Sequence, residues 1–144
     1  MADIVHELTV KAVPERVFEA IATAKGMDCW WTMSATGEPR ENAEYALGFG
    51  PRFDWRARVT RSVPASEFEL TMTDADSDWM GTRVTYRLEP TGRAATRIRF
   101  SHTGWPVENQ HWRISCYCWA MYLRLLRRYV ELGEVVPYPQ RLDA

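Results

Sequence analysis

The pattern of apolar and polar positions predicts a long helix near the C-terminus, from about Val107 to Leu132. Residues 114–132 contain neither glycine nor proline, and their apolar side chains recur at the three- and four-residue spacing of a helix face. Gly133 follows directly, at the position where a glycine commonly ends a helix. One side of the helix is expected to carry His111, Ile114, Cys118, Tyr122, Leu125, Tyr129 and Leu132.

The chemistry of this stripe indicates a lined cavity as well as packing. Two tyrosines and an imidazole bring polar atoms to a face that a purely structural core would build from leucine, isoleucine and valine. Trp119 and Leu126 are expected at one edge of the stripe, while Arg113, Arg124 and Arg127 lie on the opposite side. The helix is therefore expected to turn both apolar and hydrogen-bonding groups toward the interior.

The preceding chain alternates between apolar and polar residues in short runs, as half-buried β-strands do. The strands are expected at residues 4–10, 33–36, 44–49, 53–63, 67–72, 81–88 and 96–103. Two short helices are expected between the first and second strands, one opened by Pro14 and ended by Gly26, the other around Met27–Trp31. Short turns join the later strands, and connections of this length imply antiparallel pairing.

These elements predict an α+β fold in a single domain that spans residues 1–144. About six to seven antiparallel strands would form a curved sheet around the long C-terminal helix. Each strand has one polar face, so only one face of the sheet is expected to be covered. The long helix is the only expected element large enough to cover that face.

Composition argues against several classes of partner. The 144 residues carry a formal net charge of −1, and a chain without a positive excess is not expected to bind nucleic acid. No apolar run is long enough to cross a membrane, and the first residues lack the character of a signal peptide. We therefore expect a cytoplasmic protein that does not insert into membranes.

The sequence also argues against a metal or a cofactor. Cys116 and Cys118 lie two positions apart on the predicted helix, about 200° around its axis, so they cannot share a disulfide or a metal ion. The stretch Asp74–Asp78 begins like a calcium loop, but Trp79 stands where glycine is needed and Thr85 where a bidentate glutamate belongs. No phosphate loop, nucleophile elbow or Cys-x-x-Cys pair is present, which weighs against most enzyme classes.

Four local motifs, in this order, are similar to those of a known superfamily. They are Ala12–Ile21 after the first strand, Trp30–Trp31 after the short helices, Trp79–Val84 at a late strand and Phe100–Trp105 before the last helix. With these motifs the chain resembles the SRPBCC superfamily, the START-like, helix-grip or Bet v-like proteins. Within it, the chain is most similar to the branch named after the activator of the Hsp-ninety ATPase, the AHSA-type domains.

The resemblance implies a helix-grip fold, in which the sheet grips the C-terminal helix and leaves a hydrophobic cavity between them. Members of the superfamily bind small hydrophobic ligands, and some act as cyclases or aromatase partners. The side chains predicted to face inward are then candidates for binding an apolar, aromatic or lipid-like ligand. They are Trp30, Trp31, Phe53, Trp55, Phe68, Leu70, Met72, Tyr86, Phe100, His102, Ile114, Cys118, Tyr122, Leu125 and Tyr129. The alternative is that these residues simply fill the core.

Two other functions are open besides ligand binding. His102 or His111 could act as the base of a cyclase- or hydratase-like enzyme, with Glu108 one turn before His111 on the same side of the helix. The histidines lack the spacing of a zinc motif. The name of the family branch suggests a third function, an interaction module that regulates a chaperone ATPase. Strands at the sheet edges could also pair two copies into a homodimer.

Overall fold

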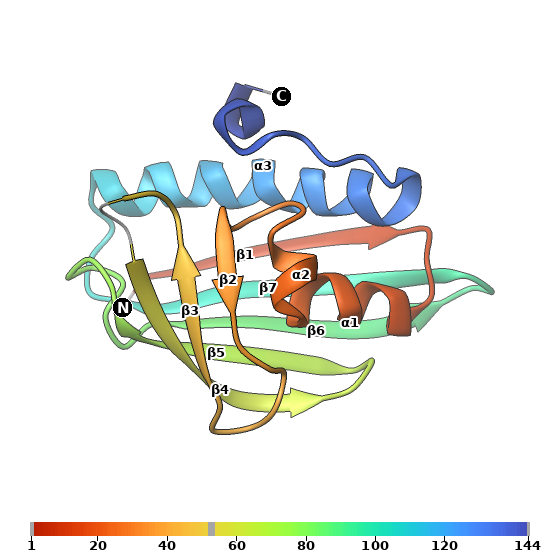
Figure 1. The fold of residues 1–144 in the computed structure, drawn as a ribbon, viewed down its shortest axis with the longest axis horizontal. Coiled ribbons are helices and arrows are strands. Elements are labelled where there is room, and N and C mark those ends of the chain that lie inside the picture. The colour runs from red at the N-terminus through yellow and green to blue at the C-terminus, as the bar shows by residue number, and fades with distance from the viewer. Residues whose placement is uncertain (1, 52–53, 144) are drawn as a thin grey trace.

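Seven antiparallel strands form one curved sheet in the computed structural model, which describes residues 2–51 and 54–143. Their order is β1-β7-β6-β5-β4-β3-β2, so all neighbours except β1 and β7 are consecutive in the chain (Figure 1). The strands are β1 (Ala2–Val10), β2 (Ser34–Thr36), β3 (Glu44–Gly48), β4 (Asp54–Val63), β5 (Glu67–Asp74), β6 (Arg83–Thr91) and β7 (Ala95–Trp105). The predicted α+β architecture with a curved antiparallel sheet is confirmed.

The helices pack on one face of the sheet, which we call the inner face. They are α1 (Pro14–Ala22), α2 (Ala24–Met27) and α3 (Gln110–Leu132), and the short 3₁₀ helix η1 (Tyr138–Asp143) packs on α3. Figure 1 shows α3 running beside β1, while α1 contacts β5, β6 and β7. The long helix was expected to cover the inner face alone. Instead α1 and α3 share it: α1 lies against β5, β6 and β7, whereas α3 lies against β1 and reaches β7 through Trp119.

Local sequence signals explain where most helices begin and end. Pro14 occupies the first turn of α1, where its missing N–H is not needed. Gly133 has a φ of 70° and ends α3 in the left-handed conformation, as the sequence predicts. Gly26, however, does not end the first helix. It lies within α2, and a Cβ at this position would stand 2.4 Å from the carbonyl oxygen of Glu19, so glycine allows α2 to pack on α1.

The buried face of α3 differs from the predicted stripe by a rotation of roughly 90°. Its buried residues are Ser115, Trp119, Leu123, Leu125, Leu126 and Val130. Two members of the predicted stripe, Ile114 and Leu132, are 51 % and 73 % exposed. The apolar arc of α3 is broad because the helix contacts both β1 and η1. Periodicity alone could not show which part of that arc faces the sheet.

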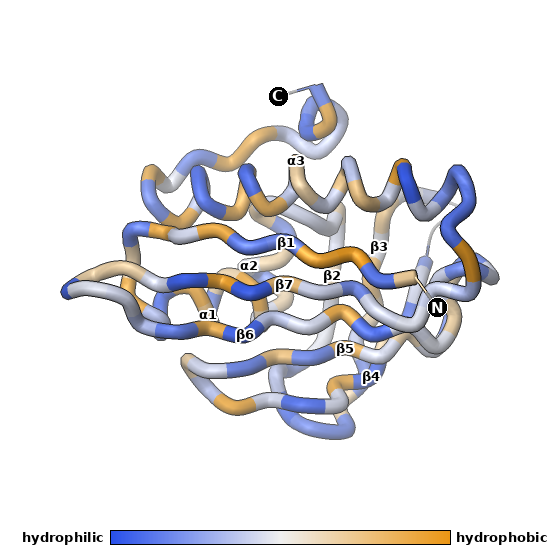
Figure 2. The backbone as a smooth tube through the Cα atoms, turned by 180° about the vertical axis from the view of Figure 1, so that it is seen from behind, coloured by the Kyte–Doolittle hydropathy of each residue, from blue (hydrophilic) through white to orange (hydrophobic). Residues whose placement is uncertain are grey.

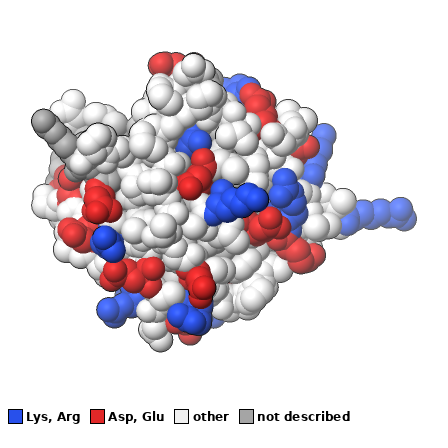
Figure 3. All heavy atoms as spheres, in the orientation of Figure 1, with Lys and Arg blue, Asp and Glu red and all other residues white. Residues whose placement is uncertain are grey.

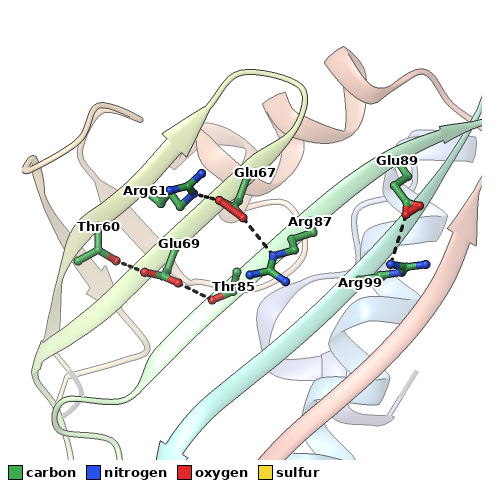
Figure 4. Close-up of polar contacts among 8 residues, drawn as sticks. All are labelled: Thr60, Arg61, Glu67, Glu69, Thr85, Arg87, Glu89 and Arg99. Atoms are coloured by element: carbon green, nitrogen blue, oxygen red, sulfur yellow. Dashed lines mark hydrogen bonds and ion pairs between the residues drawn. The ribbon is translucent and has the colours of Figure 1, made fainter.

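The opposite, outer face of the sheet is polar. Figure 2 shows hydrophobic and hydrophilic residues alternating along β1, β7 and β6. In Figure 4, the carboxylate of Glu67 lies between Arg61 and Arg87, and the Arg87 Nε–Glu67 Oε2 distance is 3.1 Å. Arg99 pairs with Glu89 at 3.4 Å on the neighbouring strands. These ion pairs join neighbouring strands on the outer face. The hydrophobic core therefore lies on the inner face.

Charges of both signs are intermixed on the face that Figure 3 shows. Arg56 pairs with Glu44 at 3.4 Å on β4 and β3, and Arg128 pairs with Glu134 just after α3. Opposite charges therefore offset one another locally, and the formal net charge of the chain is −1. Among the described residues, no helix combines the length and apolarity that crossing a bilayer requires.

Candidate functional site

A cavity of about 190 Å³ lies beside the N-terminal half of α3. Four separate stretches build its wall: the turn after α2, the β3–β4 region, the β5–β6 connection and α3. The lining residues are Trp31, Phe49, Trp55, Trp79, His111, Ile114, Ser115, Cys118, Trp119 and Tyr122. The wall is thus largely aromatic, and its parts meet only when the chain is folded.

The indole rings of the wall support one another. The rings of Trp79 and Trp119 are stacked, with centroids 6.1 Å apart and an interplanar angle of 22°. Trp55 contacts Trp79 at 4.9 Å, and Trp31 contacts Trp119 at 5.2 Å. Ile114, half-exposed, marks the side on which the cavity meets solvent. The cavity therefore has an interior of mutually packed aromatic rings and a mouth near the beginning of α3.

The structure brings part of the predicted ligand-binding set to this cavity. Trp31, Trp55, Ile114, Cys118 and Tyr122 all line it. These five residues come from the turn after α2, from β4 and from α3. Another predicted position, Phe53, lies outside the described residues.

Most of the remaining predicted residues lie in the core and not in the cavity wall. These buried residues are Trp30, Phe68, Leu70, Met72, Tyr86, Phe100 and Leu125. The reason is the position of α1, whose Phe18 ring packs edge-on against Phe68 at 6.1 Å. The half-buried Tyr129 contacts Arg16 of α1, with the guanidinium carbon 5.3 Å from the ring centroid. These residues fill the core, which is the alternative to ligand binding considered from the sequence.

Sequence reasoning missed Phe49, Trp79 and Ser115 as lining residues and placed Trp119 only at the edge of its stripe. Ser115 follows His111 by four residues, which puts both on one side of α3, so correct helix phasing would have found it. Trp79 belongs to one of the motifs of the family resemblance but lies outside any strand. The alternation of apolar and polar residues along strands therefore could not predict that Trp79 faces inward.

His102 does not line the cavity and is not available as a base, contrary to the enzyme hypothesis. The Trp119 indole N–H donates to His102 Nδ1 at 3.0 Å. His102 Nε2 donates to the Thr82 hydroxyl at 2.8 Å, and that hydroxyl donates to the Trp79 carbonyl at 2.6 Å. Burial, with a smaller contribution from His111, lowers the pKa of His102 to about 3. The imidazole is thus neutral, with both nitrogens occupied.

His111 does line the cavity, but its carboxylate partner is not the predicted one. Its Nδ1 lies 3.1 Å from Asp78 Oδ2, an oxygen that also accepts from Asn109 Nδ2 at 3.2 Å. Hydrogen bonds from Asn109 and His111 lower the pKa of Asp78. Glu108 lies outside α3, because the side chain of Asn109 caps the helix by accepting from the Trp112 N–H at 2.9 Å. The acidic β5–β6 loop supplies the carboxylate instead.

The Cys118 thiol and the Tyr122 hydroxyl of the wall are uncharged near neutral pH. Burial raises the pKa of the Cys118 thiol and raises that of the Tyr122 hydroxyl to about 12. The wall contains no arginine, lysine, aspartate or glutamate among the described residues. In the same part of the chain, no cluster of three histidine, cysteine or acidic side chains is placed to hold a metal ion. The cavity is suited to a neutral guest.

The C-terminal segment after α3 supports two parts of the wall. Arg141 is buried and donates to the carbonyls of Asp28 at 2.6 Å and Thr32 at 3.0 Å, which bracket the turn that carries Trp31. Tyr138 donates its hydroxyl proton to the Phe49 carbonyl at 3.1 Å. The positions of Trp31 and Phe49 therefore depend on a segment that is distant in sequence.

Comparison with solved structures shows the same fold in several bacterial proteins. The Aha1 dimer from Colwellia psychrerythraea has a TM-score of 0.84 and 26% identity, covering 93% of this chain and 99% of that chain. CalU16 from Micromonospora echinospora has a TM-score of 0.76 and 19% identity over 96% of this chain and 83% of its own. A Bacillus halodurans protein, BH1534, has a TM-score of 0.74 and 24% identity, over 91% and 98% of the two chains.

Sequence comparison gives the family. A search of curated proteins found no match to the chain. The family model described as "Activator of Hsp90 ATPase homolog 1-like protein" matches residues 11–131, from the end of β1 to the last turn of α3. This range includes every lining residue of the cavity. The chain therefore belongs to the Activator of Hsp90 ATPase homolog 1-like family.

Proposed function

We propose that this protein binds a small apolar molecule containing an aromatic ring in the cavity beside α3. The observation that carries the proposal is the convergence of aromatic side chains from four separate stretches on one cavity. Apolar surface removed from water stabilises a complex by about 25 cal/mol per Å². Tryptophan and tyrosine faces also favour stacked or edge-on contact with a flat guest.

The size of the cavity supports a guest of one ring. Its volume of about 190 Å³ exceeds that of an engineered cavity of about 150 Å³ that binds benzene in another protein. It is smaller than the roughly 300–1,000 Å³ common in sites for drug-sized ligands. A benzene ring with a short substituent fits this range better than a steroid or a fatty acid.

A ligand-dependent thermal shift tests the proposal, with two tryptophan substitutions on α3 as a matched pair. Ile114→Trp should narrow the mouth, whereas Leu132→Trp adds the same ring at an exposed position far from the cavity. Substituted benzenes at about a hundred times their Kd should stabilise the wild type by about 2.7 kcal/mol. We expect Ile114→Trp to weaken binding at least tenfold and Leu132→Trp to leave it unchanged.

Two results would count against ligand binding. One is the failure of every substituted benzene to raise the melting temperature of the wild type, which would indicate a filled core. The other is equal binding by Ile114→Trp and the wild type, which would place the ligand elsewhere. Native mass spectrometry of the purified protein, compared with a denatured and extracted sample, would identify any molecule that co-purifies.

A second candidate function is catalysis, and it is favoured by the pairing of Asp78 with His111. A carboxylate that accepts from Nδ1 orients an imidazole so that Nε2 can serve as a general base. Among the two histidines considered from the sequence, only His111 lies in the cavity wall. The substrate would be an enolisable or cyclising compound held by the aromatic wall.

His111→Gln separates a catalyst from a carrier. Loss of a general base lowers turnover by about 10²–10⁴-fold, whereas binding of an apolar ring should change little. The measurement is mass spectrometry of each bound ligand after incubation with the wild type and with the variant. If the wild type returns all of its ligands unaltered, the catalytic function is not supported.

Two protein partners are proposed by analogy with the family alone. The Colwellia relative is described as a dimer, and β1 and β2 are edge strands here, so two copies could pair along an edge. The family name also suggests contact with a chaperone ATPase. Light scattering after size exclusion tests the homodimer. Stimulation of the ATPase of the purified chaperone tests the second proposal, which an unchanged rate would reject.

A further inference from the structure

Two polar atoms of the cavity wall remain accessible and have no hydrogen-bond partner. They are His111 Nε2 and Ser115 Oγ, for which the described part of the chain provides no bond. Neither atom is among the side-chain nitrogens and oxygens that are buried without a partner there, which belong to Trp79, Tyr86, Trp105 and Trp112. Because His111 and Ser115 line the cavity and Ser115 is only 6 % exposed, a guest in the cavity can contact both residues.

The contacts of His111 decide which kind of group its free nitrogen can bind. Its Nδ1 lies 3.1 Å from Asp78 Oδ2. An ionised carboxylate only accepts hydrogen bonds, so Nδ1 carries the proton of the neutral ring and Nε2 is an acceptor. The ring of Trp105 also contacts the imidazole edge-on, with centroids 5.4 Å apart. An acceptor held from two sides loses little freedom when a ligand binds, which favours recognition of a specific donor.

Ser115 supplies a second polar group on the same side of α3. It follows His111 by four residues within the helix, a spacing that places the two Cβ atoms about 5–6 Å apart. A serine hydroxyl can both donate and accept. One hydroxyl group on a ligand could therefore donate to His111 Nε2 and accept from Ser115 Oγ.

The charges near this pair favour a neutral hydroxyl over an anion. The carboxylate of Asp78 lies behind the imidazole, and its negative charge disfavours a carboxylate or a phenolate at Nε2. Within residues 2–51 and 54–143, no lysine or arginine lines the cavity. An anionic guest would lose hydration without gaining an ion pair.

We infer that the ligand is a neutral phenol of one ring, whose hydroxyl donates to His111 Nε2 and accepts from Ser115 Oγ. The inference rests on the proposed function, since it names the ligand class of the same cavity. The aromatic wall would bind the ring of a phenol or of a plain hydrocarbon. His111 and Ser115 would distinguish between the two.

Phenol, toluene and anisole test this inference, because toluene has a methyl group in place of the hydroxyl and anisole keeps the oxygen but cannot donate. We expect the affinity for phenol relative to toluene to fall about three- to tenfold in His111→Phe and about threefold in Ser115→Ala. The ratio of anisole to toluene should not change in His111→Phe. The matched control is His6→Phe, at a histidine outside the cavity wall that contacts the Cys116 carbonyl at 3.2 Å, and it should leave every ratio unchanged.

A spectroscopic readout in the wild type keeps the test valid even if His111→Phe does not fold. In long-range ¹H–¹⁵N spectra the Nε2 resonance of His111 should move upfield with saturating phenol and not with toluene. An unmoved resonance, or unchanged ratios of phenol to toluene in folded variants, would overturn the inference while leaving ring binding intact. A loss of anisole affinity equal to that of phenol would also overturn it, since donation would then play no part. If neither phenol nor toluene binds, the inference and the proposed function fail together.

Discussion

His102 becomes buried in a neutral state when the protein folds. Its two ring nitrogens are hydrogen-bonded to Trp119 and Thr82, and the Thr82 hydroxyl donates in turn to the carbonyl of Trp79. An imidazolium could not accept the indole proton at Nδ1, so protonation of His102 would break its hydrogen bond with Trp119. The positions of Trp119 and Trp79, two residues of the cavity wall, therefore depend on a histidine that does not line the cavity.

The burial of His102 predicts that the protein loses stability as the pH falls. An unfolded histidine takes up a proton below a pH of about 6.5, whereas the folded protein holds the pKa of His102 near about 3. Between these values the unfolded state binds more protons, so the free energy of unfolding decreases with acidification. From pH 7 to pH 5 this single group should remove about 2 kcal/mol.

Urea unfolding at several pH values checks this expectation against His102→Gln. The variant lacks the titrating group, so its free energy of unfolding should fall by about 2 kcal/mol less over the same interval. Above a pH of about 7.5 His102 is neutral in both states, and the two proteins should show the same pH dependence. Equal slopes between pH 7 and pH 5 would mean that His102 is solvated or that it titrates normally in the folded protein.

At the scale of an element, α3 shows why a broad apolar arc misleads. The predicted stripe ran through Tyr122 and ended at Leu132, whereas the buried side runs through Trp119 and Leu126. Both arcs contain large apolar residues at helical spacing, so the periodic signal supports either one. The side through Trp119 packs on the sheet, where Trp119 bonds to His102 of β7, whereas Tyr122 lies near Tyr138 and Arg141 of η1. Neither packing partner can be read from the sequence of α3 itself.

Two leucine substitutions test the phase of α3. Leu126 is fully buried and Leu132 is largely exposed, so Leu126→Ala should lower the free energy of unfolding by about 2–5 kcal/mol. Leu132→Ala should change it by less than about 0.5 kcal/mol. Chemical denaturation of both variants gives the comparison. Equal losses would favour the phase predicted from periodicity.

The C-terminal segment is the second element whose role appears only in the fold. Arg141 is 3 % exposed, yet the sequence around it resembles an ordinary polar tail. Its guanidinium reaches back to the carbonyls on either side of Trp31. The segment therefore holds the turn after α2 against α3, and with it one side of the cavity.

Arg141→Met should detach this segment and loosen the cavity. Removing a charged donor from buried carbonyls is expected to destabilise the protein by about 2–4 kcal/mol and to weaken ring binding. The matched control is Arg93→Met, at an exposed residue of the β6–β7 turn, for which we expect a change below about 0.5 kcal/mol. Thermal unfolding and hydrogen exchange at Thr32 provide the measurements, and unchanged exchange there would argue against the anchoring role.

At the scale of the whole molecule, the family and the fold were predictable, while half of the candidate site was not. Alternation over short runs, Pro14 at a helix start and Gly133 at a helix end are local signals, and each was read correctly. The residues of the cavity wall come from four stretches, and only the packing of α1 decides which inner-face positions remain free. Phe68 and Tyr86 alternate as well as Trp55 does, but α1 and the turn after α2 cover them.

The sequence by itself determined the order of the elements, the antiparallel pairing of the consecutive strands and the polar outer face, because each depends on residues close together in the chain. Only the tertiary structure decided the rotation of α3, the pairing of His111 with Asp78 and the placing of Trp79 in the cavity wall. These features are contacts between distant segments, and their energies depend on which neighbours compete for the same surface. A pattern of apolar positions shows which element a segment forms, but not which side chains of its apolar arc are buried or what packs against them.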